Sequence, residues 1–157
     1  MKQPLLSCRI ACFALAALLL GGCARVNETG LRLVSTKSDA FLVINAQILT
    51  GTVVFVPDRT GRVSFAKDQG DISSCSGALR YTATSAGEVD LRCNDGTEVA
   101  LHFTLLSETK GYGYGTTSQG TSSIAFGLSD ADALAFLKVP PGKKIAPRAS
   151  DGALELQ

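Results

Sequence analysis

From residue 41 to residue 128 short apolar runs, several of them with an apolar residue at every second position, alternate with clusters of turn-forming residues. Successive side chains of a β-strand point to opposite faces, so a period of two indicates a strand with one buried face. In one such run, Val63 and Phe65 share one parity, while Arg62 and Ser64 share the other. The pattern predicts antiparallel strands joined by tight turns.

The pattern changes once, near the C-terminus. Ser129 can cap a helix whose first turn holds Asp130 and Asp132, where the helix dipole favours negative charge. Apolar residues follow at helical spacing until Pro140-Pro141-Gly142, where proline ends the helix. Six or seven short strands and one short C-terminal helix predict a mainly β fold, a small antiparallel sandwich or barrel.

The first 22 residues have the features of a secretory signal. Lys2 and Arg9 precede an apolar run over residues 10–20, which is too short to span a bilayer and matches the apolar core of a signal peptide. Removing this segment takes away two positive charges, so the formal net charge changes from +1 to about −1. A charge this small disfavours nucleic acid as a partner.

The apolar run ends in Leu20-Gly21-Gly22-Cys23, which resembles the lipobox of bacterial lipoproteins. Gly21 departs from the commoner Ala or Ser at its position. The resemblance covers residues 1–23 and implies that Cys23 becomes the mature N-terminus and carries covalent lipid. It implies a location in the cell envelope, anchored in membrane. Ala24 implies the outer membrane, facing the periplasm, if the source is Gram-negative.

These segments define the expected organisation of the chain. Residues 1–22 are the signal peptide, 23–40 the lipidated N-terminus and tether, 41–142 the antiparallel β domain with its late helix, and 143–157 a flexible tail. An alternative for the tether is that Leu31, Leu33 and Val34 already pair in a sheet.

The cysteines fit this organisation. Of the five cysteines, two leave with the signal and Cys23 carries lipid, so Cys75 and Cys93 remain as one pair in an oxidising compartment. Each of the two cysteines is expected on the same face of its strand as the apolar residues. A turn centred near Thr84 places the two cysteines opposite each other, which predicts a disulfide between neighbouring antiparallel strands.

The segment Gly111-Tyr112-Gly113-Tyr114-Gly115 is the most distinctive local feature. On a strand its glycines share one face and its tyrosines the other, and repeated glycine indicates close backbone approach or strong curvature. In one interpretation, the glycines let a helix or strand sit close and the tyrosines are packing residues. In the other, Tyr112 and Tyr114 form a recognition surface for a glycan, peptidoglycan or protein.

Signals for catalysis and for metals are weak. His102, the single histidine, falls on the polar parity of its strand, so we expect a solvent-facing side chain rather than a general base. We predict no catalytic residues, no metal site and no cofactor other than the lipid. The Asp68/Asp71 turn and the aspartates that follow Ser129 offer oxygen atoms for calcium, but turn and capping roles explain them.

We therefore expect a non-enzymatic binding or assembly module of the cell envelope, with an envelope protein as its partner. The alternative is a glycan- or peptidoglycan-binding module centred on Tyr112 and Tyr114. A third hypothesis is an envelope hydrolase that uses His102 or a carboxylate. The sequence contains no G-x-S-x-G nucleophile elbow and leaves no unpaired mature cysteine as a nucleophile.

Overall fold

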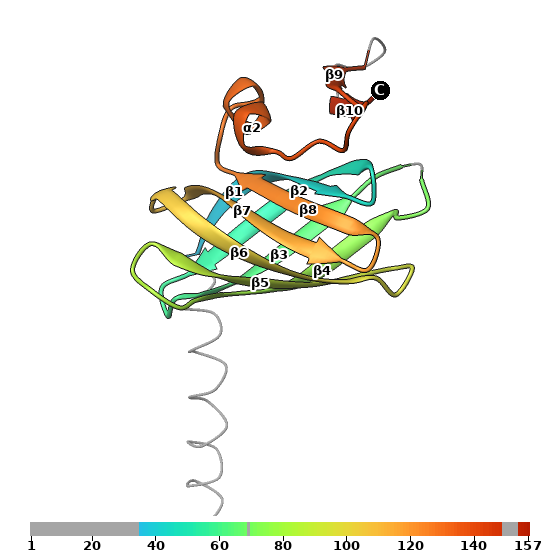
Figure 1. Ribbon diagram of the computed structural model, residues 1–157. Coiled ribbons are helices and arrows are strands. Elements are labelled where there is room, and N and C mark those ends of the chain that lie inside the picture. The colour runs from blue at the N-terminus through green and yellow to red at the C-terminus, as the bar shows by residue number, and fades with distance from the viewer. Residues whose placement is uncertain (1–34, 69, 149–153) are drawn as a thin grey trace, which may run out of the picture. The chain divides into compact units, whose positions relative to one another are not determined.

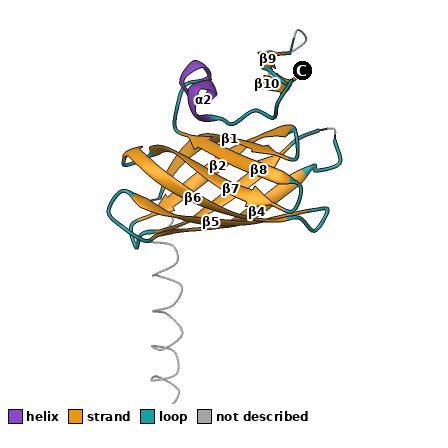
Figure 2. Cartoon of the chain, viewed as in Figure 1, coloured by secondary structure: helices purple, strands orange, loops and turns teal. Residues whose placement is uncertain are grey.

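Eight antiparallel strands pair in chain order and close into a barrel in the computed structural model (Figures 1 and 2). The structure describes residues 35–68, 70–148 and 154–157. The barrel strands are β1 (Thr36–Ile44), β2 (Gln47–Val56), β3 (Thr60–Ala66), β4 (Ser74–Tyr81), β5 (Ala86–Cys93), β6 (Glu98–Ser107), β7 (Lys110–Thr117) and β8 (Gly120–Phe126). The sandwich-or-barrel alternative is thus resolved in favour of the barrel.

The first and last strands close the barrel. β1 pairs with β8 over four residues, from Ala40 opposite Phe126 to Val43 opposite Ser123. Full closure removes the free edges that an open sheet presents to other chains. β1 begins at Thr36, five residues before the predicted start of the domain, so the end of the predicted tether is part of the barrel.

The side chains that point inward from the eight strands fill the barrel. Four aromatic rings form a continuous series, in which successive centroids lie 5.6, 6.0 and 5.5 Å apart in the order Phe55, Phe126, Phe103 and Tyr81. An eight-stranded barrel is just wide enough for side chains to fill it. Glycines make room for the large residues, since a Cβ atom on Gly51 would lie 2.7 Å from the Phe65 ring.

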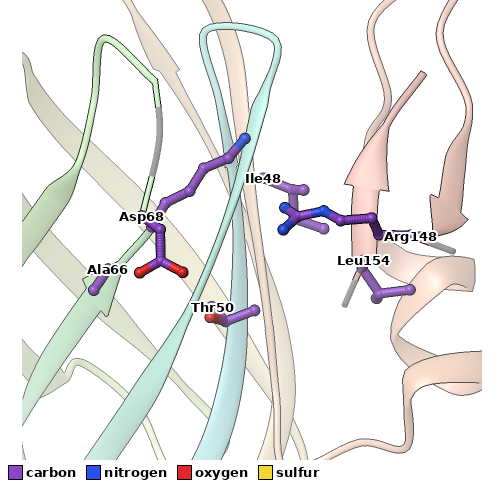
Figure 3. A pocket seen from close by; sticks show the side chains of 7 residues that line it. Ile48, Thr50, Ala66, Asp68, Arg148 and Leu154 are labelled. Carbon is purple, nitrogen blue, oxygen red and sulfur yellow. The ribbon is translucent and has the colours of Figure 1, made fainter. Parts of the chain in front are cut away.

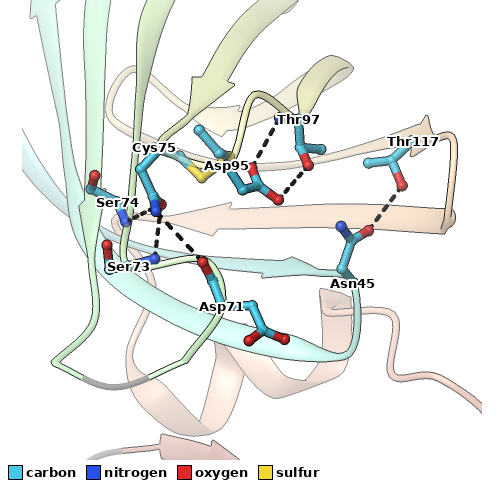
Figure 4. Close-up of a disulfide and its surroundings, with 10 residues drawn as sticks. Asn45, Asp71, Ser73, Ser74, Cys75, Asp95, Thr97 and Thr117 are labelled. Atoms are coloured by element: carbon cyan, nitrogen blue, oxygen red, sulfur yellow. Dashed lines mark hydrogen bonds between the residues drawn. A yellow bond between two sulfur atoms is a disulfide. The ribbon is translucent and has the colours of Figure 1, made fainter.

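The predicted disulfide is present. Cys75 lies opposite Cys93 in the β4–β5 pair, with both side chains buried. Next to it, the Asn94 side-chain oxygen accepts hydrogen bonds from the backbone N–H groups of Ser73 and Ser74, at 2.9 and 3.0 Å (Figure 4). The disulfide therefore joins two strands near the end of the barrel where the β3–β4 and β5–β6 turns lie.

The C-terminal segment packs on the outside of the barrel. Helix α2 (Asp130–Phe136) starts at the predicted cap, since the Ser129 hydroxyl accepts a hydrogen bond from the backbone N–H of Asp132. Beyond it, β9 (Ile145–Pro147) and β10 (Leu154–Leu156) form a two-stranded sheet. Leu154 is buried in an outer cluster with Val43, Ile48, Ala125, Ala133 and Leu137.

The pairing of β9 with β10 and the burial of Leu154 differ from the prediction of a flexible tail over residues 143–157. Figure 1 shows helix α2, β9 and β10 on the same side of the barrel. The outward side chains of β1, β2 and β8 that are buried on this side are apolar. Burial of Leu154 and pairing of β9 with β10 hold the described part of the tail in place. We refer to β9 and β10 together as the C-terminal strap.

The disulfide generates the first prediction. Replacing both Cys75 and Cys93 by Ala should lower the free energy of unfolding by about 3 kcal/mol, because the crosslink closes a loop between residues 18 apart in sequence. Urea unfolding followed by circular dichroism measures the change. The reduced wild-type protein should match the double variant. Equal midpoints for oxidised and reduced protein would contradict the prediction.

Candidate functional site

The Gly-Tyr-Gly segment forms β7, with its glycines facing the barrel interior. A Cβ atom on Gly111 would lie 2.7 Å from the Phe126 ring, and one on Gly113 would lie 2.7 Å from the carbonyl oxygen of His102. The expected close approach is confirmed. What approaches is the barrel's own core and the neighbouring strand β6, whereas α2 lies on the tyrosine side.

Tyr112 and Tyr114 lie on the outer wall and are half-buried. The Tyr112 ring stacks on Phe136 at the end of α2, with centroids 4.5 Å apart and planes 16° apart. Lys138 places its Nζ atom 4.2 Å from the centroid of Tyr114, and its backbone N–H donates to the Ser123 hydroxyl at 2.9 Å. The tyrosines are therefore packing residues for the C-terminal segment.

The partial burial of Tyr114 affects the ionisation of its hydroxyl. Burial raises the pKa of Tyr114, and the nearby Tyr112 raises it further. Of the two interpretations of the sequence, the packing role is the one these contacts support. The outer rims of both rings are the part left for a ligand.

His102 lies on the same outer wall, with its side chain 78% exposed. Its Nδ1 atom is 3.8 Å from a carboxylate oxygen of Glu88, which lies opposite it on β5. That carboxylate also accepts hydrogen bonds from Arg80 at 2.7 and 3.1 Å, which lower the pKa of Glu88. Arg80, Glu88 and His102 form a row of polar side chains across β4, β5 and β6, and solvent reaches the imidazole freely.

Two other predictions concern the lipid on Cys23 and the binding of metal ions. Cys23 falls outside the described residues. Within residues 35–68, 70–148 and 154–157, no three His, Cys, Asp or Glu side chains are grouped to hold a metal ion. In these same ranges, no helix has the length and apolar character needed to cross a bilayer.

Three of the depressions on the described surface combine charged and apolar residues. One lies between the barrel wall and the C-terminal strap and is lined by Ile48, Thr50, Asp68, Arg148 and Leu154. Figure 3 shows the Arg148 side chain extending toward Ile48. Arg148 there pairs with Glu155 at 3.2 Å. Sequence reasoning missed this cleft because the residues that form one side of it were assigned to a flexible tail.

The second depression is the mouth of the barrel, at the end where the β2–β3, β4–β5 and β6–β7 turns lie. It measures about 420 Å³ and is lined by Val56, Pro57, Arg59, Tyr81, Thr84, Leu105 and Glu108. Tyr81 is the last ring of the interior aromatic series. The Arg59 guanidinium carbon lies 5.4 Å from the Tyr81 ring centroid.

Charges of both signs act on Tyr81. Burial raises the pKa of its hydroxyl, Arg59 lowers it and Glu108 raises it. Both charged groups are therefore close enough to the tyrosine hydroxyl to affect its ionisation. The sequence offered one signal for this site: arginine occupies the position in the turn Pro57-Asp58-Arg59-Thr60 where glycine is usual.

Comparison with known proteins finds a similarity among solved structures alone. No protein-family model matches the chain, and no curated protein does. Among solved structures, a redesigned β-barrel is similar with a TM-score of 0.48 and 21% identity, over 64% of this chain and 95% of that chain. The strand pairing itself establishes the closed barrel.

The packing of α2 generates the second prediction. Replacing Phe136 by Ala removes the stacked ring on Tyr112, so backbone amides of α2 should exchange with deuterium about tenfold faster or more. Hydrogen exchange followed by mass spectrometry measures this local effect, while exchange in β3–β5 should stay unchanged. Leu134→Ala is the matched control, because Leu134 lies on the same helix and is 37% exposed. Equal effects of the two variants would show that the stacked ring does not hold the helix.

Proposed function

We propose that the chain is a membrane-anchored lipoprotein of the bacterial cell envelope and acts as a non-enzymatic binding or assembly module. The observation that carries the proposal is the filled interior of the closed barrel. Leu42, Leu101, Phe103 and Ile124 are among the fully buried side chains that occupy the space where other barrels hold a ligand. Binding is then a task for the outer wall and the ends of the barrel.

The closed barrel also limits how a partner can bind. Each of β1 to β8 has two paired neighbours, so the barrel contains no edge strand, although β1 and β8 pair over four residue pairs only. Recognition through side chains of a rigid wall suits a protein partner in the envelope. The lipobox at residues 20–23 supports the anchor. Firm anchorage needs more than one acyl chain, which lipoprotein processing supplies.

Crosslinking in cells tests the partner. A photoreactive amino acid at Arg92 or Glu98, both exposed on the outer wall, should give a discrete crosslinked product with one envelope protein in the full chain. Co-sedimentation with purified peptidoglycan tests the alternative. Binding to peptidoglycan that is lost in a Tyr112→Ala, Tyr114→Ala variant would favour the glycan-binding alternative over the proposal.

The anchor gives the third prediction. A Cys23→Ser variant should lose incorporation of a palmitate analogue and accumulate as the longer, unprocessed precursor, because serine cannot form the thioether to lipid. Metabolic labelling followed by electrophoresis measures both effects. The Cys75→Ala, Cys93→Ala variant is the matched control and should stay labelled, since its cysteines form the disulfide. Label that persists in Cys23→Ser would overturn the anchor.

A further inference from the structure

The barrel mouth lies at the end where the chain from Cys23 enters the barrel. Thr36, the first residue of β1, is opposite Phe55 at the end of β2, next to the turn that holds Arg59. The Ser38 hydroxyl donates to the carbonyl oxygen of Thr109 at 3.0 Å, in the same turn as Glu108. Residues 24–35 span about 40 Å at most when fully extended, which limits how far this end of the barrel can lie from a lipid on Cys23.

Arg59 adopts a backbone conformation that favours glycine. Its φ is +67°, in the left-handed region that costs a residue with a Cβ atom conformational energy. The turn is otherwise well formed, since the Asp58 carboxylate accepts hydrogen bonds from the backbone N–H and hydroxyl of Thr60 at 3.0 and 2.6 Å. A side chain is uncommon in this backbone region, and the arginine side chain at this position reaches over Tyr81.

The side chains of the mouth offer complementary charges around an aromatic surface. One guanidinium nitrogen of Arg59 donates to the carbonyl oxygen of Ala83, which fixes the group over Tyr81 and leaves further N–H donors for a ligand. On the described part of the chain, the exposed Glu108 carboxylate has no hydrogen bond or ion pair. An anion can therefore bind at Arg59 and a cation at Glu108, within the same depression.

We propose that the mouth binds the headgroup of a zwitterionic phospholipid, with the phosphate on Arg59 and a primary ammonium at Glu108. Guanidinium groups suit phosphate because their planar donors match its oxygen atoms. A primary ammonium brings three N–H donors to the carboxylate. The lipid source rests on the proposed anchor, because a lipid on Cys23 would tether the mouth within reach of the membrane.

Nuclear magnetic resonance titration of the full chain in detergent micelles tests the site, with two soluble headgroups as probes. Glycerophosphoethanolamine should shift the amides of Val56, Asp58 and Arg59, and those of residues 81–84 and 105–108, in a saturable manner, and glycerophosphoglycerol should bind several-fold more weakly. Arg59→Gln should weaken binding of both probes tenfold or more. Glu108→Gln should abolish the preference for ethanolamine and leave glycerophosphoglycerol binding unchanged.

Controls separate the mouth from general charge effects. Arg92→Gln and Glu98→Gln alter an exposed pair of the same two residue types, 3.8 Å apart on the outer wall, and should leave the titration unchanged. If Arg59→Gln does not fold, Arg59→Gly fits the left-handed backbone and serves the same comparison. Equal affinity for both probes, or shifts that survive both mouth variants, would overturn the proposal.

The anchor and the mouth fail in distinguishable ways. Palmitate labelling of Cys23 is measured on the same preparation. A labelled protein that does not bind glycerophosphoethanolamine overturns the mouth site alone. An unlabelled protein overturns the anchor, and the lipid source of the ligand is overturned with it.

Discussion

Pairing of β1 with β8 is the interaction on which the rest of this structure depends. It joins the two ends of a sheet of eight strands over four residue pairs, and it gives each barrel strand two neighbours. Closure confines all inward side chains to one narrow space. Inward glycines such as Gly77 and Gly115 follow from this confinement, because a Cβ atom there would meet the backbone of the adjacent strand. The filled interior in turn moves any binding to the outer wall and the ends.

The same closure explains the role of the C-terminal segment. The outward side chains of Val43, Ile48 and Ala125 form an apolar area over the strands that meet at the seam. Helix α2 and the C-terminal strap cover this area, and Leu137 and Leu154 are buried against it. Because burial of apolar surface is favourable, the cover stabilises the region where the first and last strands meet.

Much of the fold could be predicted from local patterns. Parity along β4 and β5 gave the register of the hairpin, and with it the disulfide, because both cysteines share a face with their apolar neighbours. The cap at Ser129 was equally local. Closure was not predictable in this way, since the pairing of β1 with β8 joins residues far apart in sequence. For the same reason Arg59, Tyr81 and Glu108, which come from three different turns and strands, could not be grouped beforehand. The packing of Leu154 also depends on a distant partner, so the tail looked unstructured.

The closed barrel can be tested directly by measuring distances across the seam. Nuclear Overhauser effects between backbone protons of β1 and β8 report strands that lie side by side. The structure predicts such contacts for the pairs from Ala40 with Phe126 to Val43 with Ser123, alongside those within every sequential hairpin. A spectrum with all the hairpin contacts and none between β1 and β8 would indicate an open sheet or a sandwich and contradict the account.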